Sequence, residues 1–367
     1  MLNQAPLLAG GIAGGRTRLL RDRLPMDYYA GDTLEPVPPR SGGENAHLPV
    51  STDAAWWDDR VWRQTVQATV PTVKPPQRRR ILPIVLFLAT CCTTFYSGAN
   101  WAGNLLREPP THEAREAMSA TEALFYGWPD GLLYMGAVMT ILIAHEMGHF
   151  VQAVRYGVPA SYPHFIPMPL TPIGTMGAVI KMHGSQANRR ELFDIGLSGP
   201  LAGLVIAIPV ACLGIYFAHA VPVLPGGWSF QDPLIFKPLI HWMHPNLPAN
   251  HELALNPLML AGWVGMLITG LNMMPVSQLD GGHVAYALLG RKSHWLARGV
   301  MASAVVFILV SGQYSWSVML CLVAVVGTTH PPTADDRVPL GWKRVVLGWM
   351  SMFIPVLCFM PTPIQAS

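Results

Sequence analysis

Beyond residue 80, the chain alternates between long apolar runs and short connections that carry the charges. About 20 apolar residues cross the hydrocarbon core of a bilayer as a helix. The run between Arg298 and Asp335 is too long for one crossing, because a single helix of that length would measure about 54 Å. A turn at Ser311-Gly312-Gln313 would divide this run into two short spans. The pattern predicts about seven transmembrane helices, within residues 81–106, 131–154, 196–217 and 256–276, two within 299–334, and one after Arg344.

The basic residues lie almost entirely on one side of these predicted spans. Residues 1–80 carry 11 of the 24 Lys and Arg residues. If this end is cytoplasmic, the connections 154–195, 276–298 and 329–344 add ten more, and only three basic residues lie in the connections on the other side. Cytoplasmic connections of membrane proteins are enriched in Lys and Arg. The N-terminus is therefore predicted to be cytoplasmic.

Two regions follow from this pattern. Residues 1–80 contain nine prolines and are predicted to form an extended cytoplasmic segment. Within it, Asp53–Trp62 could form a short interfacial helix or make a packing contact. Residues 81–363 are expected to form a single transmembrane domain. No secretory signal or transit peptide is recognisable, so we expect a multi-pass protein of a bacterial plasma membrane, with an organellar membrane as the alternative.

Composition agrees with an all-α polytopic membrane protein. Charged residues make up 12% of the chain and hydrophobic residues 51%, whereas a soluble domain carries about 25% charged residues. This balance excludes a disordered chain, a coiled coil and an ordinary soluble enzyme. The net charge of +3 is too small to indicate nucleic-acid binding. The five cysteines all lie in apolar runs without framework spacing, which favours buried thiols over disulfides or a thiolate zinc site.

The second predicted span is interrupted by the pattern His145-Glu146-Met147-Gly148-His149. Residues four apart project from one face of a helix, so both imidazoles can bind one metal ion. The glutamate between them can act as general base toward water that the metal activates. Ionisable groups inside an apolar span are costly and usually functional. The pattern therefore predicts a metal centre.

A catalytic zinc ion needs a third protein ligand and one open coordination position. Asp280 fits this role, because it follows the fourth predicted span. The second and fourth spans run in the same direction, so His149 and Asp280 should lie at similar depth in the cytoplasmic half. Glycines 281 and 282 would let the backbone turn and approach closely. Asp280 could otherwise be an exposed helix cap.

These motifs resemble the site-2 protease family of intramembrane zinc metalloproteases. The family shows HExxH and, in a later span, N-x-x-P-x-x-x-L-D-G, and Asn272–Gly281 matches the second pattern. The resemblance covers roughly residues 124–295 and includes Gly174-Thr-Met-Gly177 and Leu197–Gly203. We expect neither a PDZ-like domain between the motifs nor a regulatory domain after them. This arrangement resembles the compact branches of the family, including the chloroplast and cyanobacterial type.

The resemblance implies roles for individual residues. His145, His149 and Asp280 would bind one Zn²⁺ ion, and Glu146 would assist the attack of a zinc-bound water on a peptide bond. Asn272 would hold the substrate backbone near the metal, although it could also form an ordinary interhelical hydrogen bond. His283 could approach the metal site, but an exposed position is favoured.

A segment between the second and third spans is too rich in proline and glycine to form a helix. It runs from Pro163 to Ile180. Irregular backbone at membrane depth is tolerated only inside protein or beside water. The resemblance implies a re-entrant loop or short β-hairpin here. Its edge around Gly174, Gly177 and Ile180 could bind an unwound substrate as an added strand.

The expected partners are the lipid bilayer and single-span membrane proteins already trimmed by another protease. Neither a natural substrate nor an oligomeric state follows from the sequence. Two other functions compete with this one. A prenyl-protein protease would need a downstream glutamate ligand, and no glutamate follows Asp280. A catalytically idle, zinc-containing scaffold or substrate-binding chaperone would not need Glu146.

Overall fold

The computed structural model describes residues 81–106, 118–169, 171–182, 184–222, 228–327 and 329–366. The predicted cytoplasmic segment 1–80, with its proposed interfacial helix at Asp53–Trp62, lies outside the described residues. The described part is mainly helical, as expected. Its strands are short and occur in three antiparallel pairs.

Three long helices form the first part of the structure: α2 (Ile81–Trp101), α4 (Ala120–Tyr156) and α5 (Arg189–Phe217). Side-chain caps start α4 and α5. Ser119 and Glu122 form a reciprocal capping box at the start of α4, and Asn188 and Glu191 do the same for α5. These side chains satisfy backbone N–H groups that the first turn leaves unpaired. Gly157 ends α4 in the left-handed conformation, with φ 71°.

The second part contains more and shorter helices. Asn256 caps α7 (Pro257–Asn272) by accepting a hydrogen bond from Met259 N–H. A loop then leads to α8 (Asp280–Leu289) and α9 (Ser293–Ser311). The remaining helices are α6 (Phe236–Met243), α10 (Ser317–Val326), α11 (Trp342–Ser351) and α12 (Ile354–Cys358). Two strand pairs lie outside this bundle: β3 (Ala220–Pro222) with β5 (His251–Leu253), and β4 (Trp228–Phe230) with β6 (Ile364–Ala366).

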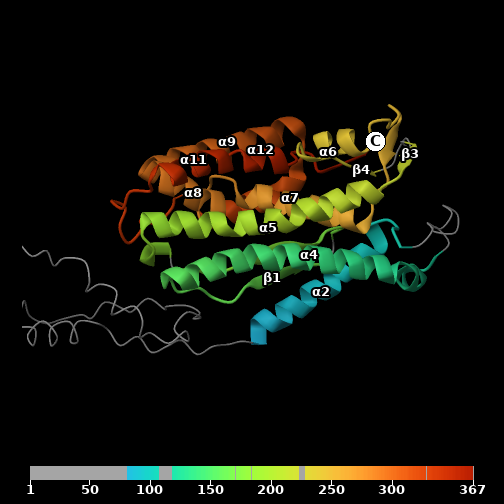
Figure 1. The fold of residues 1–367 in the computed structure, drawn as a ribbon, viewed down its shortest axis with the longest axis horizontal. Coiled ribbons are helices and arrows are strands. Elements are labelled where there is room, and N and C mark those ends of the chain that lie inside the picture. Colours follow the sequence, from blue (N-terminus) through green and yellow to red (C-terminus); the bar gives the residue numbers. More distant parts are fainter. Residues whose placement is uncertain are drawn as a thin grey trace, which may run out of the picture. The chain divides into compact units, whose positions relative to one another are not determined.

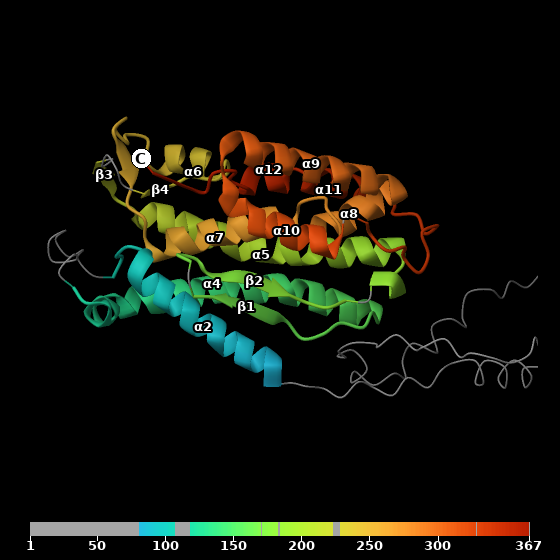
Figure 2. The same ribbon diagram turned by 180° about the vertical axis from the view of Figure 1, so that it is seen from behind.

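Helices α4 and α5 lie side by side at the centre of the bundle (Figure 1). On one side α4 contacts α2 and the strand β2, and α2 in turn contacts both β1 and β2. On the other side α5 contacts α7 and α8 (Figure 2). Of the later helices, α9 and α11 contact α8, α12 contacts α7, and α10 contacts α9. Tyr134 of α4 and Trp263 of α7 are among the largest fully buried side chains. The centre of the bundle is thus a packed core that fixes α4 relative to α5 and α7.

The predicted hairpin region contains β1 (His164–Met168) and β2 (Gly174–Val179), which pair antiparallel with an irregularity between Phe165 and Pro167. Thr93 of α2 donates a hydrogen bond to Gly174 O at 2.7 Å, and Tyr134 donates one to Ile173 O at 2.7 Å. Gly174 has φ 77°, and a Cβ there would lie 2.7 Å from Thr93 O. Only glycine fits this contact.

In the described part of the chain, four helical segments are long and apolar enough to cross a membrane: Ile81–Trp101, Thr121–Tyr156, Arg189–Phe217 and Asp280–Ser311. The shorter apolar helix α7 has 16 residues. The helices of the structure differ from the sequence prediction at two places. The connection predicted at 276–298 contains α8, which belongs to the apolar segment Asp280–Ser311. The span expected after Arg344 is divided into α11 and α12, where Pro355 lies in the first turn of α12 and has no N–H for a continuous helix.

Candidate metal centre

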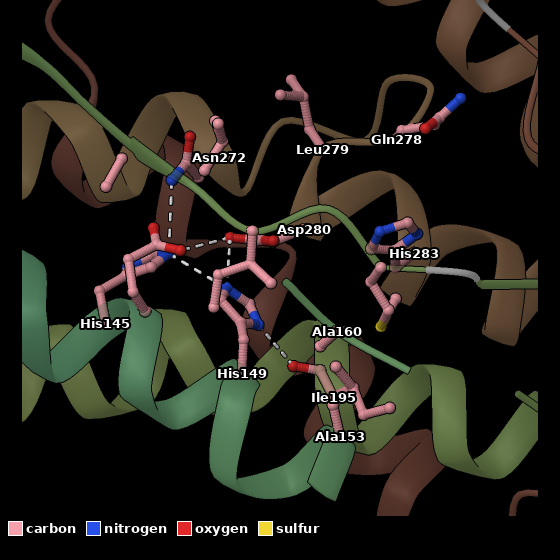
Figure 3. A pocket seen from close by; sticks show the side chains of 15 residues that line it. His145, His149, Ala153, Ala160, Ile195, Asn272, Gln278, Leu279, Asp280 and His283 are labelled. Carbon is pink, nitrogen blue, oxygen red and sulfur yellow. Dashed lines mark hydrogen bonds and ion pairs between the residues drawn. The ribbon is translucent and has the colours of Figure 1, made fainter. Parts of the chain in front are cut away.

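Helix α4 presents two histidine side chains toward the first residue of α8. His145 and His149 are four residues apart, and their Nε2 atoms lie 3.2 Å from each other. Asp280 Oδ2 lies 3.1 Å from His145 Nε2 and 3.2 Å from His149 Nε2. Figure 3 shows the three side chains converging between the helices. Residues 135 positions apart in the chain thus meet at one point.

The His149 ring is oriented by the backbone of α5. Its Nδ1 lies 2.8 Å from the carbonyl oxygen of Ile195. A carbonyl only accepts hydrogen bonds, so Nδ1 carries the proton and Nε2 presents its lone pair toward Asp280. A backbone partner of this kind fixes the tautomer and direction of a metal-binding histidine.

The three atoms fit a zinc ion in kind and in spacing. Ligand atoms about 2.0–2.2 Å from a tetrahedral zinc ion lie about 3.3–3.5 Å from one another, close to the separations of 3.1–3.2 Å between His145 Nε2, His149 Nε2 and Asp280 Oδ2. When the His149 ring is neutral, the lone pairs of its Nε2 and of the Asp280 carboxylate face each other, an arrangement that a bound cation would stabilise. Among the described residues, this is the one group of His, Cys, Asp and Glu with the geometry of a metal site.

A cavity of about 120 Å³ adjoins this cluster. Glu146 is 3% exposed and lines the same cavity. Asn272, the last residue of α7, also lines it, and its Nδ2 lies 3.4 Å from His145 Nε2. The cavity therefore brings together a carboxylate able to accept a proton and a side-chain amide able to donate a hydrogen bond.

The loop between α7 and α8 brings Asp280 to this position. Glycines 281 and 282 are buried, and a side chain at either would overlap loop carbonyl groups, of Met273 and Ser277 respectively. The expected close backbone approach is therefore present. The left-handed backbone of this loop occurs instead at Ser277, with φ 52°. Close packing of helix on loop thus places the carboxylate.

The glycines of α5 were not among the predicted site residues, yet they line the space that the histidine rings occupy. A side chain at Gly199 would overlap the His149 ring, and a Cβ at Gly203 would lie 3.1 Å from His145 Nδ1. Gly196 makes similar room for His283. The spacing of three and four residues between these glycines places them on one helix face, a signal available in the sequence. Their role is to let both histidine rings fit between α4 and α5.

The structure also places the other candidate residues. Gly174 and Gly177 lie in β2, with φ 77° and 97°, but the cavity is lined by the residues that follow them, Ala178–Ile180. His283 lines the cavity and is partly buried, rather than being exposed as expected.

The comparisons with known proteins agree with this geometry. Residues 133–311 match peptidase family M50. The Arabidopsis thaliana protein named "Probable zinc metalloprotease EGY2, chloroplastic" is 28% identical over 64% of this chain and 42% of its own length. "Probable zinc metalloprotease EGY1, chloroplastic" from the same plant is 27% identical over 77% of this chain and 53% of its own length. The chain thus spans about half the length of the curated relatives it matches.

These similarities bear on three predictions. The resemblance to site-2 proteases is confirmed, and so is Zn²⁺ as the implied metal. The names of the relatives give no support to a bacterial plasma membrane, whereas an organellar membrane is compatible with them. With HExxH on an apolar helix and an aspartate completing the cluster, residues 133–311 match peptidase family M50, the site-2 protease family of zinc metalloproteases.

Proposed function

We propose that this protein is an integral membrane protease that hydrolyses peptide bonds in the transmembrane segments of its substrates. The observation that carries the proposal is the convergence of His145, His149 and Asp280 beside Glu146, on helices long and apolar enough to span a bilayer. His145 Nε2, His149 Nε2 and one Asp280 oxygen would hold the zinc ion. Three protein ligands leave a coordination position open, which is typical of catalytic rather than structural zinc.

Bound zinc would lower the pKa of water and polarise the carbonyl of the scissile peptide bond. Glu146 accepts the proton that water loses as its oxygen bonds to the carbonyl carbon. The same carboxyl group then delivers that proton to the leaving nitrogen as the carbon–nitrogen bond breaks. The Asn272 amide donates a hydrogen bond to the substrate backbone or to the developing negative charge on the carbonyl oxygen.

Substrate presentation requires an unwound segment, since a helix keeps its carbonyl groups in internal hydrogen bonds. We assign this role to β2, because its last two residues, Ala178 and Val179, and the following Ile180 line the cavity. In the described part of the chain, β2 pairs with one strand only, β1. An extended substrate can pair with the other edge by β-augmentation. The hairpin would then be re-entrant, at the depth of the metal ligands.

The expected substrates are single-span membrane proteins already shortened by another protease. This class fits a small cavity beside membrane helices, where a large folded domain could not enter. Water reaches the site from the cytoplasmic half, where the basic connections lie, and the N-terminus is cytoplasmic in this arrangement. About seven membrane crossings remain our proposal for the whole chain.

The decisive comparison is between the wild type and Glu146→Gln, acting on a purified single-span substrate with zinc measured in both. Glu146→Gln should reduce cleavage by at least about 10²-fold, because the proton acceptor is lost, and keep its zinc. Glu122→Gln is a matched control, since Glu122 is exposed at the start of the same helix. Equal cleavage by the wild type and Glu146→Gln would refute the protease function and favour a zinc-containing scaffold.

A second experiment tests the role of β2. Proline at Ala178 or Ile180 removes a backbone N–H from the segment beside the cavity. Cleavage should fall while the zinc content stays normal. Unchanged cleavage by both proline variants would mean that the substrate does not bind along this edge.

A further inference from the structure

His283 belongs to the cavity but has no part in the chemistry described above. It lies one turn after Asp280 on α8 and lines the cavity together with Glu146 and the end of β2. In Figure 3, Asn272 and His283 lie on opposite sides of Asp280. A cavity for an extended peptide thus has an amide donor at one side and an imidazole at the other.

The hydrogen-bond partners of His283 determine which of its nitrogens carries the proton. His330 Nδ1 lies 2.6 Å from Pro331 O, so this nitrogen must donate. In a neutral ring, His330 Nε2 then accepts, and its partner is His283 Nδ1 at 2.7 Å. His283 therefore carries its proton on Nδ1 and presents Nε2 as a hydrogen-bond acceptor. Among the described residues, the one hydrogen bond of the His283 side chain is made through Nδ1, which leaves Nε2 available.

His330 is held firmly enough to impose this arrangement. It is 5% exposed, and its burial lowers the pKa of the imidazole, which favours the neutral ring, although the hydrogen bond to Pro331 O acts in the opposite direction. Its ring stacks on Tyr286 of α8, with centroids 4.4 Å apart. Its backbone N–H donates to His294 Nε2 at 3.3 Å. Tyr286 OH in turn donates to Asp336 Oδ2 at 3.0 Å.

As a hydrogen-bond acceptor in the cavity, His283 Nε2 could bind a backbone N–H group of an extended peptide. Such a chain offers N–H and C=O groups alternately along each edge. A strand added beside Ala178–Ile180 would pass between β2 and α8, because both line the cavity. Asn272 can bind only its carbonyl groups through Nδ2, whereas His283 Nε2 can bind only its N–H groups. The two side chains would thus recognise complementary groups of one peptide.

We propose that His283 is a substrate-binding residue that accepts a hydrogen bond from a backbone N–H of the extended substrate through Nε2, and that His330 is a positioning residue that holds this tautomer. This inference rests on the proposed protease function and extends it to the substrate backbone on the cytoplasmic side of the metal ligands.

The test measures substrate binding in the zinc-loaded Glu146→Gln background, where the substrate stays intact. His283→Phe should weaken the binding of a single-span substrate about five- to tenfold, which is the effect of one lost hydrogen bond. His283→Gln keeps a side-chain acceptor and should recover most of the affinity. Tyr286→Phe is the matched control, because it loses the bond to Asp336 but retains the stacked ring beside His330. It should bind like the background protein.

The positioning role of His330 can be tested by spectroscopy, because a general loss of packing around His283 would not depend on whether residue 330 is a hydrogen-bond acceptor. The imidazole ¹⁵N shifts of His283, assigned by comparison with His283→Gln, should report a proton on Nδ1. His330→Leu should yield a mixture of both tautomers, and His330→Gln, which retains an acceptor, should restore the Nδ1 form.

Equal binding by His283→Phe and the background protein would overturn the proposal, as would loss of zinc in that variant or an equal defect in Tyr286→Phe. A proton on His283 Nε2 in the wild type would overturn it as well. Failure of the wild type to cleave would instead contradict the proposed protease function, since binding and tautomer are measured without cleavage.

Discussion

At the scale of single residues, the site depends as much on the absence of side chains as on the ligands themselves. The His149 ring occupies the space that a side chain at Gly199 would fill, and the His145 ring lies close to Gly203. The Ile195 carbonyl then accepts the hydrogen bond that orients His149. A metal site buried between two helices therefore needs small residues on the helix that carries no ligand, because the rings take up the space between the backbones.

Gly199→Ala should weaken zinc binding at least tenfold, because the added Cβ displaces the His149 ring from Ile195 O. Losses of about 10–100-fold in metal affinity are usual when a hydrogen-bond partner of a metal ligand is removed. Zinc affinity can be measured by competition with a chromophoric chelator. Gly136→Ala serves as the control, since a Cβ there meets no atom within 4 Å. Equal affinity in Gly199→Ala would show that the ring does not need this space.

At the scale of elements, the hairpin is attached to the helices around it. Thr93 and Tyr134 donate to the consecutive carbonyls of Gly174 and Ile173, and Ser97 donates to Thr171 O at 3.0 Å. These bonds come from α2 and α4, so the position of β2 depends on both helices. The hydroxyl groups of the apolar helix α2 thus find hydrogen-bond acceptors in the irregular backbone between β1 and β2.

Thr93→Val should loosen the start of β2, because it removes one donor at nearly constant volume. The expected cost is about 1 kcal/mol of stability, with faster hydrogen exchange at residues 173–179 and a higher KM at unchanged zinc content. Thr140→Val is the control, since Thr140 is exposed and bonds only to Gly136 O of its own helix. Unaltered exchange in β2 would contradict the anchoring role of Thr93.

At the scale of the whole molecule, an ion pair joins α5 to one of the last helices. Arg344 at the start of α11 forms a two-pronged ion pair with Asp194 of α5, with both N–O distances at 2.7 Å. Tyr156, at the end of α4, also donates to Asp194. The Asp194 carboxylate therefore joins α4, α5 and the much later α11, close to the start of α5 that leads into the metal site.

Arg344→Met should lower the stability by about 1–2 kcal/mol, a value reduced from that of a fully buried pair because the Arg344 side chain is 34% exposed. Thermal unfolding in detergent measures this change. The double variant Arg344→Met with Asp194→Asn should recover part of the loss, since no unpaired carboxylate remains. A double variant less stable than the single one would contradict this account of the contact.

The chemical nature of this protein followed from the sequence alone. Two histidines four apart on an apolar helix, with a glutamate between them, predict a metal centre because helix geometry is local and ionisable groups in apolar surroundings are costly. The starts of α4 and α5 agree with local capping signals. The extent of the later helices was predicted less well, because α8 and α9 run together through residues expected to form a connection.

The sequence predicted that Asp280 would join the two histidines, but only the tertiary structure decided how these distant residues meet. Asp280 reaches His145 because the α7–α8 loop packs on glycines 281 and 282, and the rings fit because Gly199 and Gly203 face them. The contact between His283 and His330 likewise joins positions 47 residues apart. Local sequence patterns determine which groups are available and on which helix face they lie. Their meeting depends on how whole helices pack, which no short stretch of sequence specifies.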